Sequence, residues 1–181
     1  MNKKEALREL EANGSARTRK TYARHGIKGK MFGVSYAVLG KLSKKIGVDH
    51  ALAEELWASG IFDARVLATM IADPSRLTRK TADAWVKDYD HHGLVDALAG
   101  LVARSPAAAK LMEKWGKARS EWIAATGWSL LCHLAKLDRE LPDSFFAEKL
   151  DVIEAEIHGR KNRVRSSMNW WRLPPRLAPS V

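Results

Sequence analysis

The sequence has very little cysteine and no long apolar run. Cys132 is its single cysteine in 181 residues, which excludes an intrachain disulfide framework and any zinc site built on several cysteines. A membrane span needs roughly 18–20 apolar residues, and no stretch comes near that length. The first ten residues are charged where a secretory signal would be apolar. We therefore expect one soluble, reduced domain in the cytoplasm.

The short motifs of common enzyme classes are also missing. There is no G-x-S-x-G, no phosphate-binding P-loop and no G-x-G-x-x-G, so hydrolase, NTPase and dinucleotide-binding functions have no motif to support them. Cys132 lies in an apolar run over 128–134, where a small buried thiol is expected. The neighbouring His133 would point about 100° away on a helix, so the two do not form a nucleophile–base pair.

A polar cluster is the remaining candidate for metal chemistry. Asp88, Asp90, His91, His92 and Asp96 lie within nine positions. No H-E-x-x-H or comparable metal motif accompanies them, so we interpret the cluster as a polar helix junction. The sequence predicts neither a metal nor another cofactor.

Positive charge is concentrated at the two ends of the chain. The formal charge is +10, from 31 Lys and Arg against 21 Asp and Glu. Residues 1–45 carry +9 and residues 158–181 carry +6, which leaves −5 for the middle. Basic ends around an acidic middle favour a polyanionic partner, because phosphate contacts release counterions. A charge that serves solubility alone is the alternative. We assign DNA-phosphate contacts to Lys41, Lys44, Lys45, Arg160, Lys161, Arg163 and Arg165.

Helical periodicity runs almost from end to end, and no segment alternates as a strand would. Capping residues and Gly or Pro breaks predict the ends of the helices. Ser105-Pro106 in particular reads as an N-cap followed by proline at the first helical position. Asp49 is expected to cap one helix, and either Thr78 or Thr81 another. The expected helices cover 3–11, 16–25, 34–46, 49–59, 63–72, 78–88 or 81–88, 94–104, 105–115, 121–137, 142–157 and 162–171.

The spacing of these helices predicts the fold class. Helix pairs begin about every 28–36 residues, which fits an all-α, HEAT-like α-solenoid of antiparallel helix pairs better than a four-helix bundle. We expect residues 1–33 to form basic N-terminal helices and a loop that cap the stack. Residues 34–172 would form the repeats, and 173–181 a proline-rich tail.

Tryptophan is abundant, with seven residues in the chain. Five of them (Trp57, Trp85, Trp115, Trp122 and Trp128) lie at amphipathic positions that predict core packing. Trp170 and Trp171 follow a run of cations instead, and such a segment can stack on bases or sugars while it contacts phosphates. Packing of one of these two under the last helix is an equal alternative.

The order of short segments along the chain resembles the DNA alkylation repair family of HEAT-like DNA glycosylases. The resemblance covers about residues 22–169, and no single motif is diagnostic. The segments that carry it are 32–35, 39–42, 44–47, 56–60, 63–70, 72–74, Trp85-Val86, Asp90, 96–102, 121–123, 162–165 and Met168-Asn169.

This resemblance implies an activity and a site. The family holds duplex DNA on a basic concave face and excises cationic N3- or N7-alkylated purines. The alkylated base leaves without a general acid, so one carboxylate that stabilises the oxocarbenium-like sugar suffices. The family's catalytic Asp falls on Asp96 and its aromatic residues on His92 and Trp170. His92 replaces the usual Trp or Tyr, and a DNA-contacting Arg of the family falls on Ala125.

The resemblance leaves three functions to distinguish. The first is a glycosylase that uses Asp96 on alkylated duplex DNA at the bacterial nucleoid. The second is a DNA-binding homologue without catalysis, and the third is a protein-interaction scaffold. The family normally continues through more helices after Asn169, so the altered C-terminus also predicts self-association through an uncovered repeat face.

Overall fold

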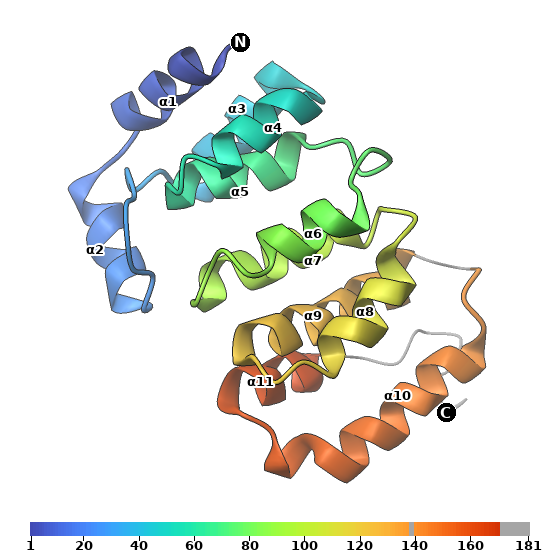
Figure 1. Cartoon of the computed structure of the whole chain (residues 1–181). Coiled ribbons are helices and arrows are strands. Elements are labelled where there is room, and N and C mark those ends of the chain that lie inside the picture. The colour runs from blue at the N-terminus through green and yellow to red at the C-terminus, as the bar shows by residue number, and fades with distance from the viewer. Residues whose placement is uncertain (138–139, 171–181) are drawn as a thin grey trace, which may run out of the picture.

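The computed structural model describes residues 1–137 and 140–170, and this part of the chain contains helices and no strand. Successive helices stack from the N-terminal to the C-terminal end of the molecule (Figure 1). The α-helices are α1 (Lys3–Ala12), α2 (Ala16–Arg24), α3 (Tyr36–Ile46), α4 (His50–Trp57), α5 (Phe62–Ile71), α6 (Arg79–Trp85), α7 (Val95–Val102), α8 (Ala108–Gly116), α9 (Glu121–Leu137), α10 (Asp143–Glu156) and α11 (Asn162–Trp170). Two short 3₁₀ turns, η1 (His92–Leu94) and η2 (Ile157–Gly159), precede α7 and α11.

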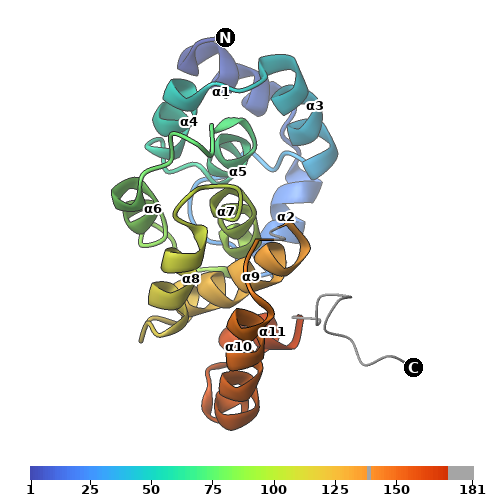
Figure 2. The ribbon, with the colours of Figure 1, turned by 90° about the vertical axis from the view of Figure 1, so that its right-hand side faces the viewer.

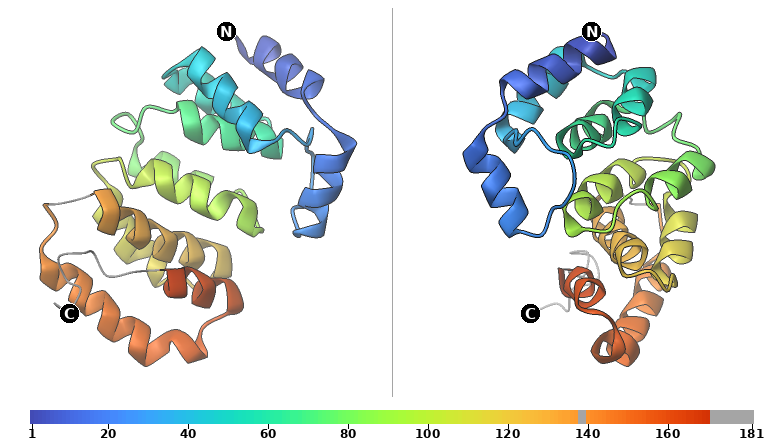
Figure 3. Two further views of the ribbon diagram at one scale, coloured as in Figure 1. Left: turned by 180° about the vertical axis from the view of Figure 1, so that it is seen from behind. Right: turned by 60° about the vertical axis from the view of Figure 1, so that its left-hand side comes forward.

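The helices form two rows, as a HEAT-like solenoid requires. Helices α4, α6 and α8 form an outer row, and α5, α7 and α9 form an inner row beside it (Figure 2). Helices α2 and α3 lie on the opposite side of the inner row from α6 and α8, and α2 stands clear of the stack (Figures 2 and 3). Helix α11 packs against α9. The predicted all-α solenoid is confirmed.

Tryptophan rings fill the contacts between repeats. The rings of Trp57 and Trp85 stack with centroids 4.2 Å apart and planes 3° apart. Trp57, Trp85, Trp115 and Trp128 are buried, and Trp122 is partly buried against the same core. Large buried aromatic surfaces dominate core energetics, so the predicted packing role of these five residues is confirmed.

A buried carboxylate attaches the N-terminal segment to the solenoid. Asp63 on α5 is fully buried and accepts backbone N–H bonds from Phe32 (2.6 Å), Gly33 (3.2 Å) and Val34 (2.7 Å). Gly33 has φ +80° and a Cβ there would lie 2.6 Å from the carbonyl oxygen of Ser15, so the turn requires glycine. These hydrogen bonds therefore fix the segment that joins α2 to α3 against the inner helix α5.

The sequence prediction fails at one helix start. Ser105 does not cap α8, which begins at Ala108 with no side-chain cap. The hydroxyl of Ser105 donates instead to the carbonyl oxygen of Val102, 2.8 Å away, at the end of α7. A serine side chain bonds to whichever backbone group is nearest, and here the preceding helix supplies it.

The predicted domain limits stay predictions. Helix α1 places Ala6 and Leu10 in the common core, whereas α2 buries none of its residues. The tail at 173–181, like Trp171, lies outside the described residues. The large exposed apolar side chains of the described part are scattered over different elements, and self-association also stays a prediction.

Candidate functional site

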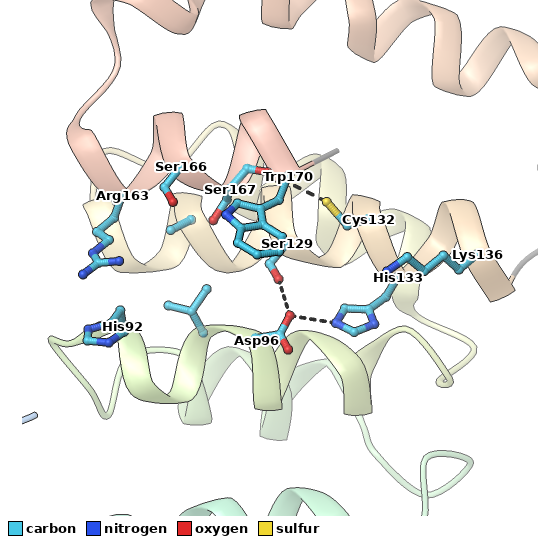
Figure 4. Close-up of a pocket in the computed structure, with 12 residues that line it drawn as sticks. His92, Asp96, Ser129, Cys132, His133, Lys136, Arg163, Ser166, Ser167 and Trp170 are labelled. Atoms are coloured by element: carbon cyan, nitrogen blue, oxygen red, sulfur yellow. Dashed lines mark hydrogen bonds and ion pairs between the residues drawn. The ribbon is translucent and has the colours of Figure 1, made fainter. Parts of the chain in front are cut away.

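A cavity of about 450 Å³ opens between η1 and α7, α9 and α11. Its wall combines side chains from all four elements, and Figure 4 shows them pointing toward one another. The α9 contribution follows helical spacing, with Ala125, Ser129, His133 and Lys136 on one face. Arg163 and Trp170 come from α11 in the same way. Residues far apart in sequence therefore form one site because α7, α9 and α11 each present side chains to the same cavity.

Asp96 lies in the first turn of α7 with its side chain 83% exposed toward this cavity. Its Oδ1 accepts a hydrogen bond from the Ser129 hydroxyl at 3.0 Å and lies 3.0 Å from Nε2 of His133. The hydrogen bond from His133 is the main reason that the pKa of Asp96 is lowered from its ordinary value. Asp96 is therefore an ionised, oriented and accessible carboxylate at neutral pH.

His92 forms the end of the cavity next to α2. Burial lowers the pKa of His92, and the positive charge of Arg163 lowers it further. The imidazole is therefore neutral at neutral pH, with a flat ring available for stacking.

Trp170 and Arg163 supply an aromatic ring and a cation to the same cavity. The indole of Trp170 is 79% exposed, unlike the five core tryptophans. Ala125 is buried in the cavity wall. Because this residue is alanine, the cavity lacks the arginine guanidinium that the family has at this position. Arg163 and Lys136 nevertheless bring two positive charges to the cavity from other positions.

The other predicted phosphate contacts lie apart from this cavity. Lys41, Lys44 and Lys45 are exposed on α3, and Lys45 pairs with Glu9 at 2.5 Å. Arg160 pairs with Glu156 and faces a separate pocket beside α8 and α10. Lys161 and Arg165 are exposed near the cavity but do not line it. Of the seven predicted cations, the structure therefore brings Arg163 to the cavity wall.

The polar cluster considered for a metal is divided among structural roles. Asp88 accepts a 2.7 Å hydrogen bond from Nε1 of Trp57, and the buried His91 accepts one from the N–H of Gly93 at 3.2 Å. His92 and Asp96 face the cavity. No group of three His, Cys, Asp or Glu side chains among residues 1–137 and 140–170 is arranged to hold a metal ion.

Two further expectations can be compared with the described residues. Burial raises the pKa of the Cys132 thiol to about 11, so this partly buried cysteine is a poor nucleophile at neutral pH. None of the described helices is both long and apolar enough to cross a bilayer.

Sequence reasoning missed the partners of Asp96. Ser129 and His133 are four residues apart on α9 and so share a face, but only the packing of α7 against α9 shows that this face meets Asp96. Tyr36 was missed as well. Its phenol is about half exposed at the start of α3, and burial, followed by the charge of Asp96, raises its pKa. Helix α3 therefore faces the same side of the inner row as Asp96.

Comparison with known proteins agrees with the helical-repeat fold. A comparison with curated proteins gives no match. One solved structure matches with a TM-score of 0.89 and 32% sequence identity, over 94% of this chain and 74% of its own. It is described as a new family of proteins related to the HEAT-like repeat DNA glycosylases, with affinity for branched DNA structures. Residues 6–171 match the family described as DNA alkylation repair enzyme, and the chain therefore belongs to that family.

Proposed function

We propose that this protein binds DNA along the face that carries the cavity, and that it prefers branched DNA over a linear duplex. The observation that carries the proposal is the exposed Trp170 indole beside Arg163 and Lys136. An aromatic ring stacks on bases or sugars while neighbouring cations contact phosphates. The similar solved structure, with its described affinity for branched DNA, supports the preference.

Helices α2 and α3 extend this face. Helix α2 carries Arg17, Arg19, Lys20 and Arg24 and no acid, and it lies on the same side of the inner row as α3 (Figure 2). Lys41 and Lys44 make no ion pair with any described residue. These cations provide contacts that are independent of DNA sequence.

Excision of cationic N3- or N7-alkylated purines is a second candidate function, and Asp96 favours it. The carboxylate is ionised and exposed, and its Oδ2 accepts no hydrogen bond from the described residues. That oxygen is free to face an oxocarbenium-like sugar, while the cationic base leaves without a general acid. Two residues argue against excision: His92 stands where the family has a larger aromatic ring, and Ala125 stands where it has an arginine.

Binding and excision are tested together. Affinity is measured by fluorescence anisotropy for a linear duplex, a three-way junction and a four-way junction of equal base-pair number, over a range of salt concentrations. We expect a steep salt dependence for all three and tighter binding of the junctions. Equal affinity for all forms would remove the branched preference, and weak, salt-independent binding would favour the scaffold function. Release of methylated purines from alkylated duplex DNA then distinguishes the two DNA-directed functions.

A further inference from the structure

A second positively charged surface lies between α6 and α8, two outer helices on the other side of the solenoid from α2 and α3 (Figure 2). It is a groove of about 760 Å³ between α6 and α8. Five cations and one acid line it, which gives a net charge of +4 in a middle segment whose total charge is −5. The cations are Arg79, Lys80, Lys87, Lys110 and Lys114.

The single acid of this groove is already occupied. Asp83 accepts hydrogen bonds from Nζ of Lys114 at 2.6 Å and from Nε1 of Trp115 at 2.9 Å. Burial alone would raise the pKa of Asp83, but these two hydrogen bonds outweigh it and lower the pKa. Asp83 therefore anchors α8 to α6 and neutralises Lys114.

The other four cations make no hydrogen bond or ion pair with Asp83. Arg79, Lys80, Lys87 and Lys110 are exposed and make no ion pair with any described residue. Like charges on facing helices repel one another, and a bound polyanion relieves this repulsion. Helices α6 and α8 thus line one groove with exposed cations, and such cations can contact the phosphate backbone of a nucleic acid.

We propose that this α6–α8 groove binds the phosphate backbone of a second arm of the branched DNA whose first arm lies on the cavity face. This inference rests on the proposed function. The two surfaces lie on opposite sides of a wall of two helix layers, and each helix is about 10–12 Å across. A linear duplex has a persistence length of about 150 base pairs and cannot fold around such a wall. Two arms that diverge from one junction can lie on its two sides, which explains a preference for branched DNA.

The test removes three charges from the groove and leaves the Asp83–Lys114 pair intact. The variant is Lys80→Gln, Lys87→Gln and Lys110→Gln, and the charge-matched control is Lys3→Gln, Lys4→Gln and Arg8→Gln on α1. For a four-way junction we expect affinity to fall at least about tenfold in the groove variant, and the slope of log affinity against log salt to fall by about 2 to 3. For a linear duplex we expect a change below about twofold.

The outcomes separate this inference from the proposed function. If the wild type prefers junctions and the groove variant keeps that preference, the second-arm contact is wrong while the proposed function stands. That result would assign the groove to another partner, such as an acidic protein. If the variant loses affinity equally for linear and branched DNA, the groove contacts DNA but not as a second arm, and the inference again fails. If the wild type shows no preference for junctions, the proposed function itself fails.

Discussion

His133 on α9 and Asp96 on α7 face each other across neighbouring inner helices, with Nε2 and Oδ1 3.0 Å apart. Ser129, one turn earlier on α9, donates to the same oxygen at 3.0 Å. Two partners on one rigid helix restrict the orientation of the carboxylate, and its second oxygen accepts no hydrogen bond from the described residues. A carboxylate fixed in this way is suited to an electrostatic role, since its dipolar surroundings do not have to reorganise.

Replacing His133 by Gln should raise the pKa of Asp96 toward its ordinary value, because the largest stabilising contact to the carboxylate is weakened. The lowered pKa adds a little stability above the unfolded-state pKa, and this contribution disappears as pH falls through the folded pKa. The pair is exposed on the Asp96 side, so the contribution is below about 1 kcal/mol. An NMR titration of the Asp96 carboxyl carbon measures the shift, and an unchanged midpoint would show that His133 does not control Asp96.

Asp96→Asn should leave DNA affinity equal or slightly higher, because a negative charge near the phosphates is removed. If the protein excises alkylated purines, the same change should abolish their release, since an amide does not stabilise an oxocarbenium-like sugar as a carboxylate does. Anisotropy and a base-release assay measure the two effects. Asp90→Asn is the matched control, because Asp90 is exposed but does not line the cavity. Excision that persists in Asp96→Asn would exclude this carboxylate from the chemistry.

The fold was predictable from sequence because local signals agree with one another. Asp49 caps α4 through its side chain, as its position predicts, and of the two expected candidates Thr78 and Thr81 it is Thr78 that caps α6. The site was predictable in part, since the resemblance places Asp96, His92 and Trp170, and the structure brings all three to one cavity. Which helix faces meet is decided by packing. The sequence alone therefore does not show that His133 lies opposite Asp96, or that α6 and α8 form one basic groove.

Trp170→Ala should weaken binding of branched and linear DNA by about 5- to 150-fold, which corresponds to the 1–3 kcal/mol typical of one aromatic stacking contact. Thermal stability should barely change, because the indole is 79% exposed. Leu137→Ala is the control, since Leu137 is 55% exposed at the end of α9 and does not line the cavity. Anisotropy and a thermal melt check both expectations. Unchanged affinity would mean that the Trp170 ring does not contact DNA.

Gly127→Ala should strongly destabilise the protein through the contact between α9 and α8. A Cβ at Gly127 would lie 2.5 Å from the backbone nitrogen of Gly116 and 2.8 Å from the carbonyl carbon of Trp115. Both are backbone atoms, so relief requires the two helices to separate. Overpacking of this kind costs about 1–3 kcal/mol and occasionally more, and about 3 kcal/mol lowers the melting temperature by roughly 6–12 °C in a domain of this size.

Gly40→Ala is the matched control, because a Cβ there meets no atom within 4 Å inside α3. It should raise stability by about 0.5–1 kcal/mol through helix propensity. Melts of opposite sign would confirm that the α8–α9 approach requires glycine, whereas a neutral Gly127→Ala would show that these helices are farther apart.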